Sequence, residues 1–71
     1  MATPITLETG GTVWKLHVKA GDEVTAGQEV FILEVMKMEV PYEAPSAGRV
    51  TAIHIAEGDV VAEGQTALVL S

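Results

Sequence analysis

The segment EVMKMEV, residues 34–40, places Lys37 between two methionines and near two glutamates. Basic residues are scarce in this chain, which has four of them among 71 residues. Methionine is flexible and polarizable, and proteins use it inside cores or on surfaces that another molecule contacts. The residue types and their spacing therefore raise two possibilities: Lys37 is an ordinary strand residue, or its amine is the target of another molecule.

Two other pairs of residues could carry chemistry. His17 and His54 alternate with apolar residues, so we expect both to point away from the core, and two histidines without further ligands are a weak metal signal. Asp22 and Asp59 each follow a glycine, and an aspartate in such a turn stabilises the local backbone. The chain has no cysteine, hence no thiolate metal site and no disulfide. We expect a structural or solvated role for the two histidines and a structural role for the two aspartates.

The elements that position these residues follow from an internal repeat. Residues 11–33 and 48–70 align without a gap at a constant offset of 37 residues. The identical pairs are Gly11/Gly48, Val13/Val50, His17/His54, Gly21/Gly58, Asp22/Asp59, Val24/Val61, Gly27/Gly64, Gln28/Gln65 and Leu33/Leu70. Two copies are too few for a solenoid. We therefore predict one pseudo-symmetric domain over residues 1–71.

Each copy of the repeat has the pattern of β-structure. Trp14, Leu16 and Val18 alternate with Lys15 and His17, which is the two-residue period of a half-buried strand. On this pattern Trp14 would fill the core or its rim. Gly-Asp and Gly-Gln pairs supply the turns. The sequence predicts an all-β fold with four short strands in each half: a flattened barrel or sandwich of two four-stranded antiparallel sheets, a barrel-sandwich hybrid with a pseudo-two-fold repeat.

The linker between the two copies is predicted to form a hairpin over residues 34–43. Residues 29–35 and 38–43 read as two strands joined tightly around Met36 and Lys37. A two-residue turn of the favoured hand needs positive φ, which Asn-Gly adopts easily and Met-Lys does not. Such a broken local rule is typical of functional sites. We therefore favour recognition over core packing as the role of the methionines.

Composition excludes several classes of partner. A formal charge of −6 is unsuited to nucleic acid or to an anionic membrane surface, since both attract basic patches. The aliphatic runs VFIL and ALVL are too short to span a bilayer, and the N-terminal residues do not resemble a signal peptide. We expect a soluble, cytoplasmic protein that is a monomer in isolation.

From about residue 5 to residue 70 the chain resembles the biotinyl/lipoyl carrier-domain family. The resemblance rests on the two-fold repeat, on VKAGDEVTAGQEV, and above all on EVMKME. Met-Lys-Met marks the biotinyl branch of the family, whereas the lipoyl branch usually has Asp-Lys-Ala. The pattern is most similar to the small free-standing bacterial biotin/lipoyl attachment proteins. It departs from the family in having LETGG where Pro-Met is common, and Val35 where Ala or Ser is common.

The resemblance implies that a biotin protein ligase attaches biotin to Lys37 through an amide. It also implies that the domain carries CO₂ between a biotin carboxylase and a carboxyltransferase, as a carrier and not as an enzyme. The lysine amine must be neutral to react, and free lysine has a pKa of about 10.4. Because Glu34 and Glu39 nearby should favour the charged form of the amine, the ligase must supply the base. Glu34, Met36, Met38 and Glu39 are the expected ligase-recognition residues.

Two alternatives remain open at this level. The first is a lipoyl carrier modified on Lys37, because the glycine turns and Glu34 would also suit a lipoyl ligase. The second is an unmodified β-domain used for binding or assembly, in which Lys37 is an ordinary hairpin residue.

Overall fold

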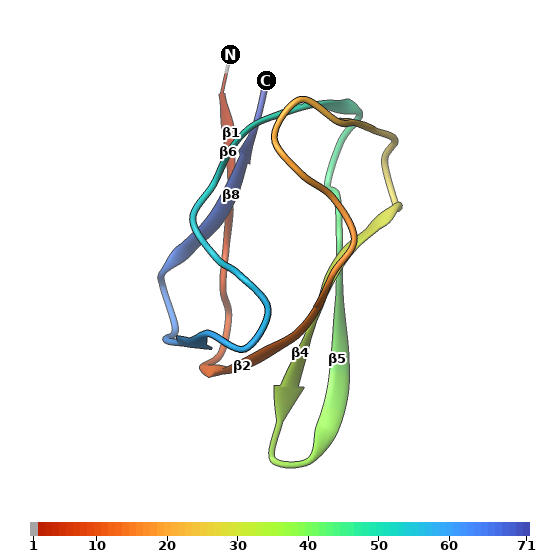
Figure 1. Ribbon diagram of the computed structural model, residues 1–71. Helices are drawn as coiled ribbons and strands as arrows, with labels where there is room; N and C mark the ends of the chain where they lie inside the picture. Colours follow the sequence, from red (N-terminus) through yellow and green to blue (C-terminus); the bar gives the residue numbers. More distant parts are fainter. Residues whose placement is uncertain (1) are drawn as a thin grey trace.

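The computed structural model describes residues 2–71, which form eight β-strands in two antiparallel sheets (Figure 1). The strands are β1 (Thr3–Thr6), β2 (Gly11–Leu16), β3 (Glu23–Val24), β4 (Glu29–Val35), β5 (Met38–Glu43), β6 (Gly48–Ile53), β7 (Val60–Val61) and β8 (Thr66–Leu70). One sheet has the order β1-β8-β6-β3, and the other has the order β5-β4-β2-β7. The predicted fold of two four-stranded antiparallel sheets is confirmed.

The pseudo-symmetry of the sequence is also present in the topology. Adding 37 to the bounds of β2 gives those of β6, and adding 37 to those of β3 gives those of β7. Each sheet takes two strands from each half of the chain, so neither half can form a complete sheet alone. The two inner strands of each sheet come from one half of the chain, and the other half supplies its two edge strands.

The core lies between the two sheets and is made almost entirely of aliphatic side chains. Its buried members are Ile5, Leu7, Val13, Val18, Val24, Val30, Phe31, Leu33, Ala44, Val50, Ile55, Val61, Ala67, Leu68 and Leu70. No polar or charged residue among residues 2–71 is buried, so the core needs no internal hydrogen-bonded network. Phe31 stacks on the half-buried Tyr42 with ring centroids 4.7 Å apart, which ties β4 to β5.

The turns that close each half use the same contacts twice. The backbone N–H of Lys19 donates to Asp22 Oδ2 over 3.0 Å, and that of Ala56 donates to Asp59 Oδ2 over 2.9 Å. The side chains of the two repeated glutamines accept equivalent backbone bonds, from Thr25 and Ala62. The predicted local role of both aspartates is confirmed.

The prediction for Trp14 was wrong. The pairing of β2 with β4 is irregular between Val13 and Lys15, and β6 with β8 is irregular at the equivalent position. This bulge interrupts the two-residue alternation, so that Val13 is buried and Trp14 is 44% exposed. The Lys15 amine lies 5.5 Å from the Trp14 ring centroid, over the ring. Trp14 is therefore a surface residue, and the hydrophobic pattern alone cannot show this because it assumes an unbroken strand.

Two glycines mark close approaches between strands. A Cβ atom at Gly11 would lie 2.7 Å from the backbone oxygen of Glu34, and one at Gly48 would lie 2.7 Å from that of Ser71. Real Cβ atoms do not approach backbone oxygens this closely, so either position admits a side chain only if a strand shifts. At Gly11 the strand that would shift is β4, which leads into the hairpin.

Candidate functional site

The turn of the β4–β5 hairpin lies at one end of the molecule, beyond the other strands (Figure 1). Figure 1 shows its turn at the end opposite to both chain termini. The molecule is elongated, with principal extents of 32, 18 and 17 Å. The two strands pair from Glu29/Glu43 to Val35/Met38, and β5 is the edge strand of its sheet. The strand bounds agree with the sequence prediction, and Met36 and Lys37 form the two-residue turn.

Both turn residues have left-handed backbone conformations. The φ angle is 52° at Met36 and 67° at Lys37, and these are the only non-glycine residues with positive φ in the described part of the chain. A left-handed conformation costs an L-residue with a Cβ atom roughly 1–2 kcal/mol. The turn at Met36 and Lys37 is thus conformationally strained, and Asn-Gly at the same two positions would avoid that strain. This pattern is typical of positions whose side chains serve a function other than stability.

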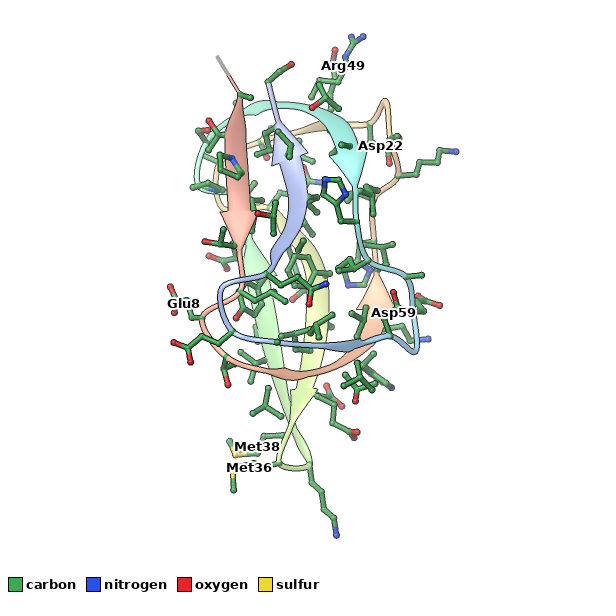
Figure 2. All side chains as sticks on the ribbon, turned by 90° about the vertical axis from the view of Figure 1, so that its left-hand side faces the viewer. Glu8, Asp22, Met36, Met38, Arg49 and Asp59 are labelled. Carbon is green, nitrogen blue, oxygen red and sulfur yellow. The ribbon has the colours of Figure 1, made fainter. Side chains whose placement is uncertain are left out.

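The methionine side chains at the tip face solvent. Met36 is 91% exposed and Met38 is 68% exposed, and neither belongs to the core. Figure 2 shows both side chains at the end of the hairpin, far from Arg49 at the other end of the molecule. Lys37 between them is exposed as well. Apolar side chains that gain nothing from the core and remain in water are candidates for contact with a partner.

The two glutamates of the motif lie opposite each other across the hairpin. Glu34 on β4 pairs in register with Glu39 on β5, and both side chains are exposed. Like charges placed directly opposite in an antiparallel pair are destabilising. The hairpin therefore carries a second unfavourable local choice within three residues of Lys37. The Glu34/Glu39 pair and the strained turn are both unfavourable for stability, and both lie next to the Lys37 amine.

The base of the hairpin is well anchored. Leu33 is fully buried, and Val35, the partner of Met38 in the ladder, packs against the core. Pro41 lies on the edge strand β5, where a residue without an N–H is tolerated. The tip is thus an exposed turn on a fixed support, a geometry that presents Lys37 without burying it.

Both histidines lie on the surface of the molecule. His17 Nε2 lies 2.8 Å from Glu29 Oε2, and both side chains are about two-fifths exposed. His54 is exposed on the other copy of the repeat. Residues 2–71 contain no group of three or more His, Cys, Asp or Glu side chains that could hold a metal ion. Both histidines therefore point away from the core, as predicted.

Two shallow cavities lie away from the tip. One, of about 640 Å³, is lined by Glu23, Val24, Thr25, Ala47, Gly48, Arg49 and Ser71. The other, of about 530 Å³, is lined by Glu8, Thr9, Val40, Pro41, Tyr42 and Glu43. Neither has Lys37 or a flanking methionine in its wall.

Sequence reasoning missed two exposed apolar residues, Trp14 and Val60, which are 44% and 83% exposed. Both lie on the β2–β7 side of the second sheet, where Thr12 pairs with Val60. The only sequence signal for Val60 is its place in the pair Val60-Val61, of which one member must face outward in a strand. Residues 2–71 contain no helix long and apolar enough to cross a membrane.

Comparisons with known proteins agree with this geometry. A family model described as "Biotin-requiring enzyme" matches residues 1–70. The biotin/lipoyl attachment protein of Bacillus subtilis (strain 168) is 55% identical over 40 residues, which are 56% of this chain and 55% of that protein. The methylmalonyl-CoA carboxyltransferase 1.3S subunit of Propionibacterium freudenreichii subsp. shermanii is 66% identical over 29 residues, 41% of this chain and 24% of the subunit.

A solved structure has the same fold. The urea carboxylase of Kluyveromyces lactis matches with a TM-score of 0.91 and 35% identity, covering 100% of this chain and 6% of the carboxylase. The matched regions thus span about half or less of each of these proteins.

Proposed function

The chain belongs to the biotin-requiring family, and from this membership we propose that it is a biotin carrier that holds the cofactor on Lys37. The observation that carries the proposal is the strained tip of the β4–β5 hairpin. There Lys37 lies exposed between Met36 and Met38, both of which face solvent.

The residues at the tip fit a covalently attached group. A primary amine on an exposed turn is open to a modifying enzyme, and the absence of Lys37 from the walls of the two cavities is compatible with a group that swings free. After a base of the ligase has taken its proton, the neutral Lys37 amine attacks the carboxyl carbon of biotin activated as biotinyl-adenylate, and the bond from that carbon to AMP breaks as the amide forms. Met36 and Met38 offer the ligase an apolar surface, and Glu34 and Glu39 offer it polar contacts.

When bound, biotin supplies a ureido nitrogen that accepts a carboxyl group from one enzyme and gives it to another. The role of the chain is to present that group. A tether raises the effective concentration of the cofactor at each enzyme, so neither enzyme needs high affinity for the carrier. The fixed sheets and the extended hairpin separate the attachment point from the rest of the surface.

We propose that the partners are a biotin protein ligase, a biotin carboxylase and a carboxyltransferase. Two similar proteins are named as a carboxyltransferase subunit and a urea carboxylase, which supports partners of this kind. The chain itself is a carrier and performs no catalysis in this proposal. A monomeric state in isolation and a cytoplasmic location, both expected from the sequence, belong to the same proposal.

A second candidate is a lipoyl carrier that uses the same lysine. The observation that favours it is the similarity to a protein named as a biotin/lipoyl attachment protein. The methionines on both sides of Lys37 favour biotin, because the lipoyl branch usually has Asp-Lys-Ala there. The two candidates use one attachment point and differ in the ligase that recognises it.

The test is a paired labelling assay with purified biotin and lipoyl ligases. We expect wild type to accept biotin at a much higher rate than lipoate, and Lys37→Arg to accept neither. Lys15→Arg is the matched control, since it makes the same change on β2, and it should label at the wild-type rate. Preference for lipoate would establish the second candidate. Absence of labelling by both ligases would contradict the carrier function.

A further inference from the structure

The two methionines at the hairpin tip are open to oxidants as well as to partners. Methionine usually fills gaps in cores, but the buried core of this protein contains none of the methionines of residues 2–71. Met36 and Met38 instead leave 91% and 68% of their surface in solvent. Exposure governs how readily a thioether is oxidised. The two side chains beside the proposed attachment lysine are thus the accessible thioethers of the described chain.

We infer that Met36 and Met38 form a redox-sensitive modification site that controls whether Lys37 can be modified. The oxidant is a peroxide. Its O–O bond breaks, one oxygen atom bonds to the thioether sulfur, and the remainder leaves as water when the oxidant is hydrogen peroxide. The sulfur loses two electrons and the peroxide gains them. The product, methionine sulfoxide, is returned to methionine by sulfoxide reductases.

Oxidation changes the chemistry of the tip without touching the fold. Because neither side chain belongs to the core, a sulfoxide on Met36 or Met38 removes no core packing. The neighbouring Val35 packs against the core, and its ladder pairing with Met38 is made by the backbone. The change is therefore confined to the surface, where it replaces an apolar side chain by a polar and chiral one.

This inference rests on the proposed function, in which a ligase contacts the methionines when it reaches Lys37. Bringing a sulfoxide against an apolar ligase surface strips water from a polar group that gains no partner. Oxidation should thus act as a reversible block on loading of the carrier.

The test uses the full chain without attached cofactor. The protein is treated with hydrogen peroxide, the peroxide is removed with catalase, and biotin ligase is then added. Peptide mass mapping should find one added oxygen on each of Met36 and Met38, with the thermal midpoint unchanged. The rate of biotinylation should fall at least about tenfold. Treatment with methionine sulfoxide reductases of both stereospecificities should restore it.

The matched variant is Met36→Leu with Met38→Leu, which keeps two unbranched-Cβ apolar side chains on the turn but has no sulfur there. Its ratio of treated to untreated rates should stay near one. The inference is overturned if oxidised wild type labels at the untreated rate, or if the leucine variant loses labelling to the same extent. If the leucine variant labels too slowly to measure, the reductase treatment of oxidised wild type decides instead. Recovery of the biotinylation rate supports the inference, and no recovery overturns it.

The untreated wild-type sample distinguishes a failure of this inference from a failure of the proposed function. Untreated wild type that accepts no biotin contradicts the proposed function itself. Untreated wild type that labels normally, followed by oxidised protein that labels equally well, contradicts only the redox inference.

Discussion

Met36 and Lys37 are adjacent residues that both hold a left-handed backbone, with φ of 52° and 67°, at the tip of the β4–β5 hairpin. Neither residue type favours this conformation. The sheet on either side imposes it, because two-residue hairpins require this twist to match their strands. The two turn residues therefore lower the stability of the folded protein, and they do so at the site of the proposed modification.

The first prediction follows from that strain. Replacing the turn by Met36→Asn with Lys37→Gly should raise the stability of the protein by about 1–2 kcal/mol, since both new residues adopt positive φ at low cost. For a domain of this size each 1 kcal/mol corresponds to roughly 4–8 °C in the thermal midpoint. Thermal unfolding followed by circular dichroism measures it. The control Met36→Leu with Lys37→Arg keeps the strain and should show no gain. A midpoint that is unchanged or lower in the Asn-Gly variant would mean that the turn is not strained.

The second prediction concerns the identity of the cofactor. Met36→Asp with Met38→Ala converts the motif to one close to the lipoyl pattern, and it places a carboxylate against an apolar ligase surface. Biotinylation should fall at least about tenfold, which corresponds to about 1.4 kcal/mol at the transition state. Lipoylation should be retained or increased. The measurement is the labelling rate with each ligase, and an unchanged preference would show that recognition lies elsewhere on the surface.

Because Met36 and Met38 are exposed, the same double variant should unfold within a few degrees of wild type. Exposed substitutions typically change stability by no more than about 0.5 kcal/mol. A large fall in the midpoint would assign the methionines a packing role.

The third prediction uses the symmetry of the fold. Gly11→Ala and Gly48→Ala place equivalent Cβ atoms 2.7 Å from the backbone oxygens of Glu34 and Ser71. Each should destabilise the protein by about 1–3 kcal/mol, as overpacking does. Gly11→Ala should also slow biotinylation, because the strand it displaces leads to Lys37, whereas Gly48→Ala should label normally while folded. Equal labelling of the two variants, measured well below both midpoints, would argue against coupling between this contact and the tip.

The fourth prediction is that the histidines are dispensable. His17 makes one exposed side-chain hydrogen bond with Glu29, and even exposed pairs of full charges contribute only about 0–1 kcal/mol. His17→Ala with His54→Ala should therefore lower stability by no more than about 1 kcal/mol and leave the biotinylation rate unchanged. Urea unfolding and the ligase assay test the two parts. A loss of labelling in a folded double variant would show a role that the geometry does not indicate.

Much of the fold could be predicted from the sequence because the chain repeats its own pattern. Turn residues such as Asp22 and Asp59 act through bonds to nearby backbone, and local chemistry of this kind is readable from residue type and position. The hairpin strands were predicted with their observed bounds for a related reason. The broken turn rule at Met36 and Lys37 stands out because the other predicted turns use the residue types that turns favour.

The placement of Trp14 could not be predicted in the same way. A bulge shifts the alternation between Val13 and Lys15, and a bulge depends on the partner strand as well as on the residues that form it. The cross-strand meeting of Glu34 and Glu39, by contrast, follows from the register that the predicted two-residue turn at Met36 and Lys37 sets. The ligase that recognises the hairpin tip is a separate protein, so the sequence of this chain does not identify it.

The most direct measurement is the intact mass of the protein purified from a biotin-sufficient host, followed by peptide mapping. The account predicts a single biotin adduct on Lys37 and none after Lys37→Arg, with both proteins unfolding at similar temperatures. Lys15 and Lys19 serve as internal controls, because they are the other lysines of the chain and lie away from the tip. Biotin found mainly on Lys15 or Lys19, or a folded protein without any biotin in such a host, would contradict the account.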